Sequence, residues 1–280
     1  MQNAENVQNC ARVLQSKIPR GFVPAVGLIL GTGLSGTVAA VDDPQYIPYA
    51  ELPGFPVSGA PSHQGRFVAG RISGVPVLAQ QGRCHLYEGR SGADVAAGVR
   101  VTALCGAKSL IIANAAGALN PLFASGTMML IDDHINMTGT SPLTGPDDNA
   151  STRFPDMSRA YDPEYIRLAG DTALRLSLRL EKGVYIGVAG PQLETRAETR
   201  FYRMIGGDAI GMSTVAEVIA AVHAGLRVLG FSCLTNRNLP DCPAAVSIEE
   251  IVAAAEKISA DLTVLLRALL PRMAGKETSI

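Results

Sequence analysis

The sequence predicts an α/β fold, with a single domain over residues 1–280 and a mixed central β-sheet flanked by helices. Three observations favour this class. The 280 residues, 47% of them hydrophobic, can bury a large core without requiring a second domain. Short β-branched segments recur along the chain, and helical patterns separate several of them. Ser73-Gly74 between two of these segments is typical of a tight hairpin turn, so the sheet must include antiparallel strands.

The expected strands are short runs rich in branched and aromatic residues, bounded by turn-forming residues. They are Val26–Leu30, Phe67–Ile72, Val75–Ala79, Leu110–Ala113, Met128–Ile131, Val184–Val188 and Leu226–Leu234. Two segments rich in Pro, Gly and Asp, Asp42–Arg66 and Thr138–Asp162, are expected to be long loops.

Four helices are expected from capping patterns, in which a Ser or Thr oxygen accepts a free N–H of the first turn. The pattern pairs Ser91 with Asp94, Thr195 with Glu198, Thr214 with Glu217, and Ser247 with Glu250. The helices would run through residues 92–105, 195–205, 215–224 and 248–270. A proline at the first helical position predicts a fifth helix, from Pro163 to Glu181.

Charge and cysteine content argue against several classes of protein. The 24 Lys and Arg nearly balance the 25 Asp and Glu, so the net charge indicates no broad basic surface for nucleic acid or an anionic membrane. Five cysteines without a Cys-x-x-Cys pair favour neither a disulfide framework nor a zinc site, and a cytoplasmic location is expected. The uncharged segment Val23–Val41 is broken by Pro24 and four glycines, which favours strand, loop and helix start over a membrane span.

A glycine-rich segment, Gly31–Gly36, follows the first expected strand and matches a dinucleotide-binding fingerprint. That fingerprint also needs a full helix, a second strand and an acidic residue about 20 positions further on, and the helix here is too short. We interpret the segment as a loop whose backbone approaches a phosphate, with the Thr32 hydroxyl as an extra donor. A plain turn from strand to helix explains the glycines equally well.

The segment Gln81–Gly89 places three polar side chains at alternate positions just after a strand. In an extended chain Arg83, His85 and Tyr87 would share one face. An arginine fork beside an imidazole forms a compact clamp for an anion, which we favour over a solvated surface. His63 lies in a Pro- and Gly-rich loop that would close over a ligand, although taken alone that segment indicates only a loop.

Two further segments suggest ligand contacts from the backbone. Ile111–Gly117 is a buried strand running into small residues, whose N–H groups can face a ligand, although close packing explains the same composition. Ser213 lies next to the expected cap Thr214, at the positive end of a helix where anions bind, and we favour this role over one that only assists the cap.

Two polar side chains suit the edge of a planar ligand. Glu194 lies on the loop before Thr195, where its carboxylate would accept two N–H bonds, or alternatively stabilise the dipole of the following helix. Asn236 ends an apolar strand, where α/β proteins place ligands, although asparagine there is also a common turn residue.

Taken in order, these segments resemble the trimeric purine nucleoside phosphorylases over nearly the whole chain. The matching motifs are Leu30-Gly31-Thr32-Gly33-Leu34, His63 with Gly65-Arg66, Gly82-Arg83 with His85–Gly89, Asn114–Gly117, His134-Ile135-Asn136, Arg153-Phe154-Pro155, Ala189-Gly190-Pro191 with Glu194-Thr195, Gly211–Thr214 and Thr235-Asn236. The resemblance implies the nucleoside phosphorylase fold, with a partly barrel-like sheet. It also implies phosphorolysis of inosine, guanosine and their deoxy forms in purine salvage, with phosphate as co-substrate and neither a metal nor an organic cofactor.

The resemblance also implies a role for each matching residue. His85, Glu194 and Asn236 would be catalytic. Phosphate would be bound by Thr32, His63, Arg83, His85, Ser213 and the backbone of Ala115. Ribose would contact Tyr87, Met212 and Ile248, and the base would contact Ala116, Leu193, Glu194, Asn236 and Arg237. Phe154 would reach into the site of a neighbouring subunit, which implies a homotrimer.

The sequence departs from the family pattern at Thr32, Leu193, Arg237 and above all Ile248, which stands where a histidine usually binds the ribose 5′-hydroxyl. An apolar residue there would favour a 5′-alkylthio group, so a methylthioinosine or methylthioadenosine phosphorylase is an open alternative. A metal-dependent nucleoside hydrolase would need an acidic cluster such as Asp132-Asp133 or Asp147-Asp148. A nucleoside-binding protein without catalysis is the third alternative.

Overall fold

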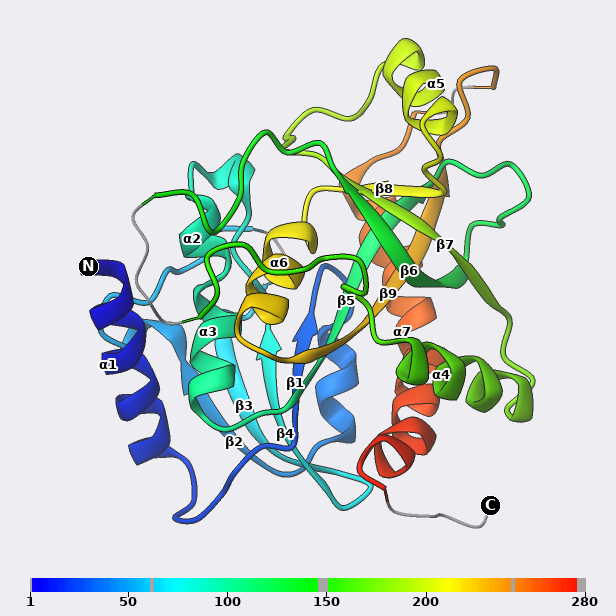
Figure 1. Cartoon of the computed structure of the whole chain (residues 1–280). Helices are drawn as coiled ribbons and strands as arrows, with labels where there is room; N and C mark the ends of the chain where they lie inside the picture. The colour runs from blue at the N-terminus through cyan, green and yellow to red at the C-terminus, as the bar shows by residue number, and fades with distance from the viewer. Residues whose placement is uncertain (1, 61–62, 146–150, 243–244, 276–280) are drawn as a thin grey trace.

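The β-sheet determines where the loops of this chain meet. The computed structural model describes residues 2–60, 63–145, 151–242 and 245–275, and in these residues nine strands form one sheet (Figure 1). The strands are β1 (Val26–Leu30), β2 (Asp42–Pro48), β3 (Arg66–Ile72), β4 (Val75–Gln81), β5 (Ser109–Ala118), β6 (Thr127–Asn136), β7 (Leu180–Gly187), β8 (Ala209–Gly211) and β9 (Arg227–Arg237). Their order is β2-β3-β4-β1-β5-β8-β7-β6-β9.

The sheet is mixed and partly closed, as the sequence predicted. Strand β1 pairs in parallel with β4 and β5, whereas β3 and β4 form an antiparallel hairpin through Ser73 and Gly74. Both turn residues have positive φ, 49° and 76°, the backbone geometry that matches the twist of a two-residue hairpin. Because β9 also pairs with β5, the strands β5, β8, β7, β6 and β9 close on themselves like a small barrel.

Helices flank this sheet, and four of them begin where the capping patterns indicated, whereas the helix over Gln2–Lys17 was not expected. The described helices are α1 (Gln2–Lys17), α2 (Gly92–Val95), α3 (Ala97–Leu104), α4 (Pro163–Arg175), α5 (Arg196–Met204), α6 (Val215–His223) and α7 (Ile248–Met273), with short 3₁₀ helices η1 (Ser35–Ala40), η2 (Tyr49–Glu51) and η3 (Leu86–Glu88). The hydroxyls of Ser91, Thr195 and Ser247 each accept the expected first-turn N–H.

The structure corrects several element boundaries. The helix expected over residues 92–105 is split at Ala96, and α4 ends at Arg175 because Ser177 takes a positive φ of 54° and leads into β7. The segment expected to be a loop from Asp42 contains β2, an edge strand with a register shift and mostly half-exposed or exposed side chains, so it lacks hydrophobic alternation. Strand β8 was missed because three residues form no recognisable pattern.

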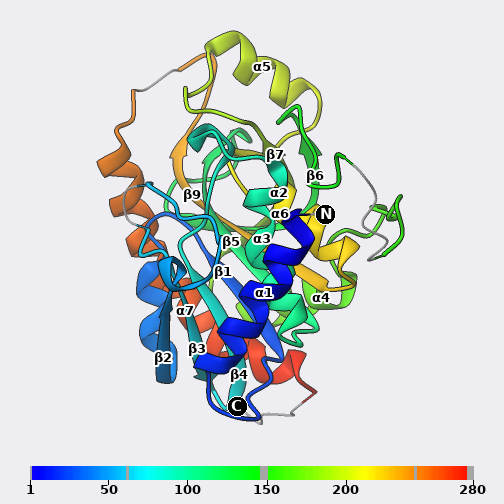
Figure 2. The same ribbon diagram turned by 90° about the vertical axis from the view of Figure 1, so that its left-hand side faces the viewer.

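Both faces of the central strands are buried. Leu28 and Leu30 of β1 pack in one core with α4, α7 and η1, whereas Ile29 packs in a second core with α3 and α6. A third core joins α1 and α3 to β2, β3 and β4, and α1 lies beside α3 in Figure 2. The strands therefore need apolar side chains on both sides, which explains their nearly continuous hydrophobic sequence.

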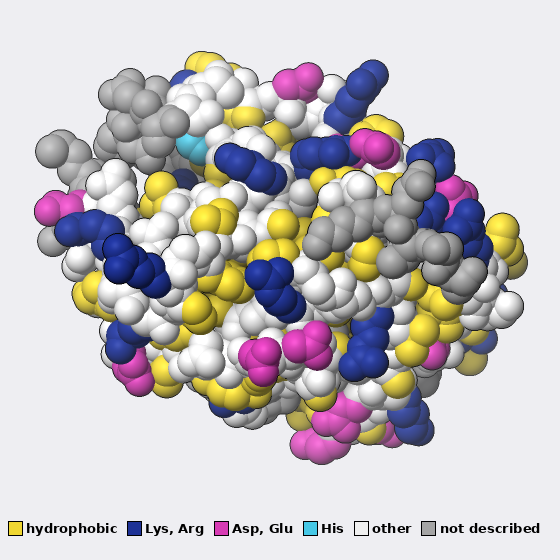
Figure 3. All heavy atoms as spheres, turned by 90° about the horizontal axis from the view of Figure 1, so that it is seen from below, with side chains coloured by type: hydrophobic (Ala, Val, Ile, Leu, Met, Phe, Trp, Pro, Cys, Tyr) yellow, Lys and Arg dark blue, Asp and Glu magenta, His cyan; other side chains and the backbone are white. Residues whose placement is uncertain are grey.

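The surface carries both signs of charge. Figure 3 shows Lys and Arg side chains interspersed with Asp and Glu on the face it presents, in line with the nearly balanced composition. None of the helices in the described residues has the length and apolar character that crossing a membrane requires.

Candidate active site

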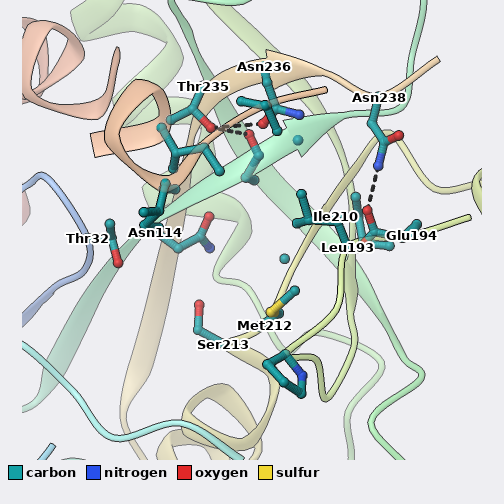
Figure 4. A pocket seen from close by; sticks show the side chains of 18 of the residues that line it. Thr32, Asn114, Leu193, Glu194, Ile210, Met212, Ser213, Thr235, Asn236 and Asn238 are labelled. Carbon is teal, nitrogen blue, oxygen red and sulfur yellow. Dashed lines mark hydrogen bonds between the residues drawn. The ribbon is translucent and has the colours of Figure 1, made fainter. Parts of the chain in front are cut away.

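A cavity of about 470 Å³ opens where the carboxyl ends of several parallel strands meet. Strands β4, β1, β5 and β9 run in the same direction, so the loops that follow them lie at one edge of the sheet. The turn between β8 and α6, the loop after β7 and the first turn of α7 complete the wall (Figure 4). Residues from nearly the whole length of the chain therefore face one space.

Most residues that the sequence suggested for ligand contacts line this cavity. They are Thr32, Arg83, His85, Tyr87, Ala115, Ala116, Leu193, Glu194, Met212, Ser213, Asn236, Arg237 and Ile248. His63 lies just behind the wall, with its Nε2 3.5 Å from Thr32 Oγ1. Phe154 does not line the cavity and is 88% exposed, so its expected contact with a neighbouring subunit stays a prediction.

Arg83 is buried at one end of the cavity and is firmly held. Its Nη1 donates to Glu217 Oε2 at 2.9 Å, and its Nη2 donates to the carbonyl oxygen of Ala113. The side chains of Arg83 and Glu217 are only 2% and 1% exposed. The Nε–H group is buried and has no hydrogen-bond partner in the described part of the chain. A buried donor without a partner indicates a place for a ligand acceptor.

The local geometry after β4 differs from the predicted extended stretch. The strand ends at Gln81, Gly82 takes a φ of 103°, and η3 follows, so Arg83, His85 and Tyr87 do not alternate on a strand. The three side chains still line the cavity. The rings of His85 and Tyr87 stack with centroids 4.7 Å apart, and Arg83 turns toward Glu217.

Two neutral imidazoles lie beside the arginine. The rings of His63 and His85 stack at 5.1 Å, and burial lowers the pKa of each histidine to about 4, helped by the positive charge of Arg83. Glu88 accepts the backbone N–H of His85 and lies 3.0 Å from its Nδ1. Because the Glu88 carboxylate can only accept, Nδ1 carries the proton of the neutral ring.

Ser213 is presented by a strained turn at the start of α6. Thr214 has a φ of 73°, and the Val215 N–H donates to Ser213 O at 2.8 Å, which closes a γ-turn. Glu217 Oε2 accepts the Thr214 N–H at 2.9 Å as well as the Arg83 guanidinium. One buried carboxylate therefore holds both Arg83 and the Ser213 turn in place.

A series of hydrogen bonds from Asn114 through Thr214 ends at the Ser213 hydroxyl. Asn114 Nδ2 donates to Thr214 Oγ1 at 2.8 Å, and Thr214 Oγ1 lies 3.1 Å from Ser213 Oγ. When Thr214 donates to Ser213, the proton of Ser213 is free to bind an acceptor in the cavity. Together with the N-terminus of the nine-residue helix α6, this end of the cavity favours an anion.

The opposite end of the cavity combines an amide with a carboxylate. Asn236 Oδ1 accepts from the Thr235 hydroxyl at 3.1 Å, which leaves its Nδ2 as the group available to a ligand (Figure 4). Gly117 lies beneath it, and a Cβ there would be only 3.4 Å from that nitrogen. Glu194 faces the cavity from the loop after β7, and burial raises the pKa of its carboxyl group.

Comparison with known proteins agrees with this arrangement. The sequence profile described as the Phosphorylase superfamily matches residues 25–271. The chain is 43% identical over 267 residues to purine nucleoside phosphorylase 1 of Bacillus subtilis, covering 95% of this chain and 98% of that protein. It is 42% identical to the purine nucleoside phosphorylase of Rattus norvegicus, covering 96% of both.

The chain belongs to the purine nucleoside phosphorylase family. A solved structure of a schistosoma purine nucleoside phosphorylase in complex with hypoxanthine superposes with a TM-score of 0.90, at 35% identity over 96% of this chain and 97% of that one. The Schistosoma mansoni purine nucleoside phosphorylase in complex with adenosine also gives a TM-score of 0.90, at 34% identity over 99% of this chain and 98% of the other. The family and its fold, both suggested by the motifs, are thus confirmed.

Sequence reasoning missed two residues of this phosphorylase site. Glu217 was interpreted only as part of a helix cap, yet it is the buried partner of Arg83. Asn238 was not considered, yet its Nδ2 donates to Glu194 Oε2 at 2.5 Å. Its spacing from Asn236 could have revealed it, because alternate residues at the end of a strand share a face.

The acidic pairs considered for a metal lie away from the phosphorylase cavity or outside the described residues. Asp132 Oδ2 is 3.0 Å from the Lys182 ammonium, and neither Asp132 nor Asp133 lines the cavity. Asp147 and Asp148 lie outside the described residues. In the part of the chain that is described, no three His, Cys, Asp or Glu side chains gather as a metal site would require.

Proposed function

We propose that the chain catalyses the reversible phosphorolysis of 6-oxopurine nucleosides and deoxynucleosides to free base and (deoxy)ribose 1-phosphate. It is thus a pentosyltransferase of purine salvage, as the names of its relatives support. One observation carries the proposal: a single cavity has donors for an anion at one end and an amide with a carboxylate at the other. A nucleoside fits between them, with its ribose next to the anion.

The two ends of the cavity suit the charges that develop during the reaction. A phosphate oxygen attacks C1′ of the ribose as the bond from C1′ to N9 of the purine breaks, and the bonding electrons leave with the base. The sugar becomes positive and the base negative in the transition state. The phosphate anion, held by donors from Thr32, Arg83 and Ser213 and by its own P–OH group donating to His85 Nε2, stabilises the first charge, and the Asn236 amide donating to N7 stabilises the second.

Base selection follows from the donors and acceptors at the far end. The Glu194 carboxylate accepts the N1–H of a 6-oxopurine, and Asn236 Nδ2 donates to N7 and O6. Adenine has an unprotonated N1 and an amino group at C6, so both contacts are mismatched. Mismatched polar groups in a buried site lower kcat/KM for the wrong substrate by roughly 10⁴-fold. Inosine and guanosine are therefore the expected substrates.

Assembly and location belong to the same proposal. Phe154, 88% exposed on the described surface, is expected to contact the site of a neighbouring subunit, so the working form is a homotrimer. The enzyme is expected in the cytoplasm. Phosphate is the co-substrate, and neither a metal nor an organic cofactor takes part.

A second candidate function concerns the 5′ position of the ribose. The side chains that α7 and the segment before it contribute to the cavity include Val246, Ile248 and Ile251, all of them apolar. An apolar wall favours a 5′-methylthio group over a 5′-hydroxyl, which needs a polar partner. Because the far end carries Asn236, methylthioinosine suits this cavity better than methylthioadenosine.

The test is the release of base from inosine, guanosine, adenosine, methylthioinosine and methylthioadenosine, with and without phosphate. The proposal expects phosphate-dependent release, faster from inosine than from adenosine. Release without phosphate would identify a hydrolase, and binding without release would identify a nucleoside-binding protein. Faster turnover of adenosine than of inosine would contradict the assigned base specificity.

A further inference from the structure

The Glu194 carboxylate is held from one side by the side chain of Asn238 (Figure 4). Asn238 Nδ2 lies 2.5 Å from Glu194 Oε2, and both residues line the cavity. The backbone N–H of Asn238 donates to Ala118 O at 2.8 Å, which fixes its position beside the end of β5. The backbone of Asn238 is therefore held in place without Glu194, and its side-chain amide points at the Glu194 carboxylate.

The neighbours of Asn238 determine which amide atom faces Glu194. Thr199 Oγ1 lies 3.2 Å from Asn238 Oδ1, on the other side of the amide. An ionised carboxylate only accepts hydrogen bonds, so the amide NH₂ group must face it. The single proton of the Thr199 hydroxyl, which Thr195 O can also accept at 3.0 Å, then turns to the amide oxygen. The reversed amide is satisfied only if Glu194 carries a proton to donate to the amide oxygen. The orientation of Asn238 and the protonation of Glu194 are thus coupled.

We propose that Asn238 is a specificity-determining residue, whose amide donates to Glu194 and keeps its carboxylate as a pure acceptor for the N1–H of a 6-oxopurine. The inference rests on the proposed function, because it concerns how the same site selects its base. An adenine base presents an acceptor at N1 and needs a protonated Glu194. The donor from Asn238 opposes that protonation, whereas burial of the carboxyl group favours it.

Other charged groups act on Glu194 from the elements around it. Glu198 on α5 raises the pKa of Glu194 by repulsion, and Tyr202 on the same helix is also close enough to interact electrostatically. Arg196 and Arg237 line the cavity, but each donates to a backbone carbonyl group. Of the side chains near Glu194 in the described residues, only Asn238 forms a hydrogen bond with its carboxylate.

Replacing Asn238 by Leu tests the proposal, because it removes the donor and keeps a similar volume. Losing one hydrogen bond to a charged group should raise the Glu194 pKa by about one pH unit. In the pH profile of kcat/KM for inosine, the fall on the acid side should then occur about one pH unit higher. The protonated fraction at pH 7 would grow about tenfold, so the ratio of kcat/KM for inosine to that for adenosine should fall about tenfold.

A second variant, Asn238→Asp, keeps the shape of the side chain and replaces the donor by a carboxylate. Two carboxylates so close together cannot both ionise, so the pair retains a proton near neutral pH. The inosine-to-adenosine ratio should fall further than in N238L. This variant also keeps the test decisive if the leucine variant does not fold.

The control is Asn120→Asp, which makes the same exchange at a matched pair outside the cavity, where Asn120 Nδ2 donates to Asp208 Oδ1 at 2.8 Å. Its substrate ratio and the acid side of its pH profile should equal those of the wild type. The inference is overturned if N238L and N238D leave both quantities unchanged in an enzyme that splits inosine, or if N120D shifts them equally. If the wild type itself releases no base from inosine with phosphate, it is the proposed function that fails.

Discussion

Replacing Glu217 by Leu should strongly destabilise the protein, because it leaves the Arg83 guanidinium buried without its counter-ion. The two side chains are 2% and 1% exposed, so water cannot replace the lost partner. Breaking a buried ion pair on one side costs about 3–5 kcal/mol, and the orphaned Thr214 N–H adds about 1–3 kcal/mol. The total is a large part of a typical unfolding free energy of about 5–15 kcal/mol.

The double variant Arg83→Met/Glu217→Leu separates charge from packing. An apolar pair of similar volume needs no counter-ion, so only the Thr214 N–H is left unpaired and the loss should shrink to about 1–3 kcal/mol. Ala113 O, which Arg83 also contacts, keeps the Gly31 N–H as a donor at 3.2 Å. The folded double variant should nonetheless lose about 10²–10³ in phosphorolysis rate, because Arg83 is one of the proposed phosphate donors.

Equilibrium unfolding in urea, followed by circular dichroism, measures these differences. Asp94→Asn is the matched control, since Asp94 accepts the backbone N–H of Ser91 in a helix cap outside the cavity. That variant should lose no more than about 1 kcal/mol. A loss below about 1 kcal/mol in E217L, or a double variant no more stable than E217L, would refute the reasoning.

Three further predictions follow from the same geometry. Since burial lowers the pKa of His85 to about 4 whereas the unfolded value is about 6.5, stability is fully present above pH 6.5 and is lost as the pH falls toward 4. The wild type should therefore lose unfolding free energy between pH 7 and pH 5, and His85→Asn should lose about 1–2 kcal/mol less over the same interval in urea titrations. An equal loss in both proteins would contradict a buried neutral imidazole at position 85. Ile248→Asn should lower the ratio of KM for inosine to KM for methylthioinosine about threefold to tenfold in steady-state kinetics. An unchanged ratio of the two KM values would show that this side chain does not face the 5′ group. Phe154→Ala should change the unfolding free energy of the monomer by no more than about 0.5 kcal/mol, because the ring is exposed. It should raise KM for inosine, because the ring is expected to contact the site of a neighbouring subunit. Unaltered kinetics would remove the main argument for a shared site.

The sequence by itself determined most of the strands, the starts of the capped helices and most side chains that line the cavity. Capping pairs such as Thr195 with Glu198 act within one helical turn, and a hairpin such as Ser73-Gly74 acts between adjacent residues. Such interactions depend on near neighbours, so their pattern is visible in the chain itself. The side chains proposed to bind the anion, such as Thr32 and Ser213, were found in the same way, because each stands close to the end of a strand or the start of a helix.

Only the tertiary structure decided which of those groups hold one another. Arg83 and Glu217 are 134 positions apart, and Glu194 and Asn238 are 44 apart, so no local pattern links them. The pairing of β5 with β9 closes the barrel and brings the ends of both strands to the cavity. Partners so distant in sequence meet only when the whole sheet has formed, because the direction of each strand end depends on every strand beside it.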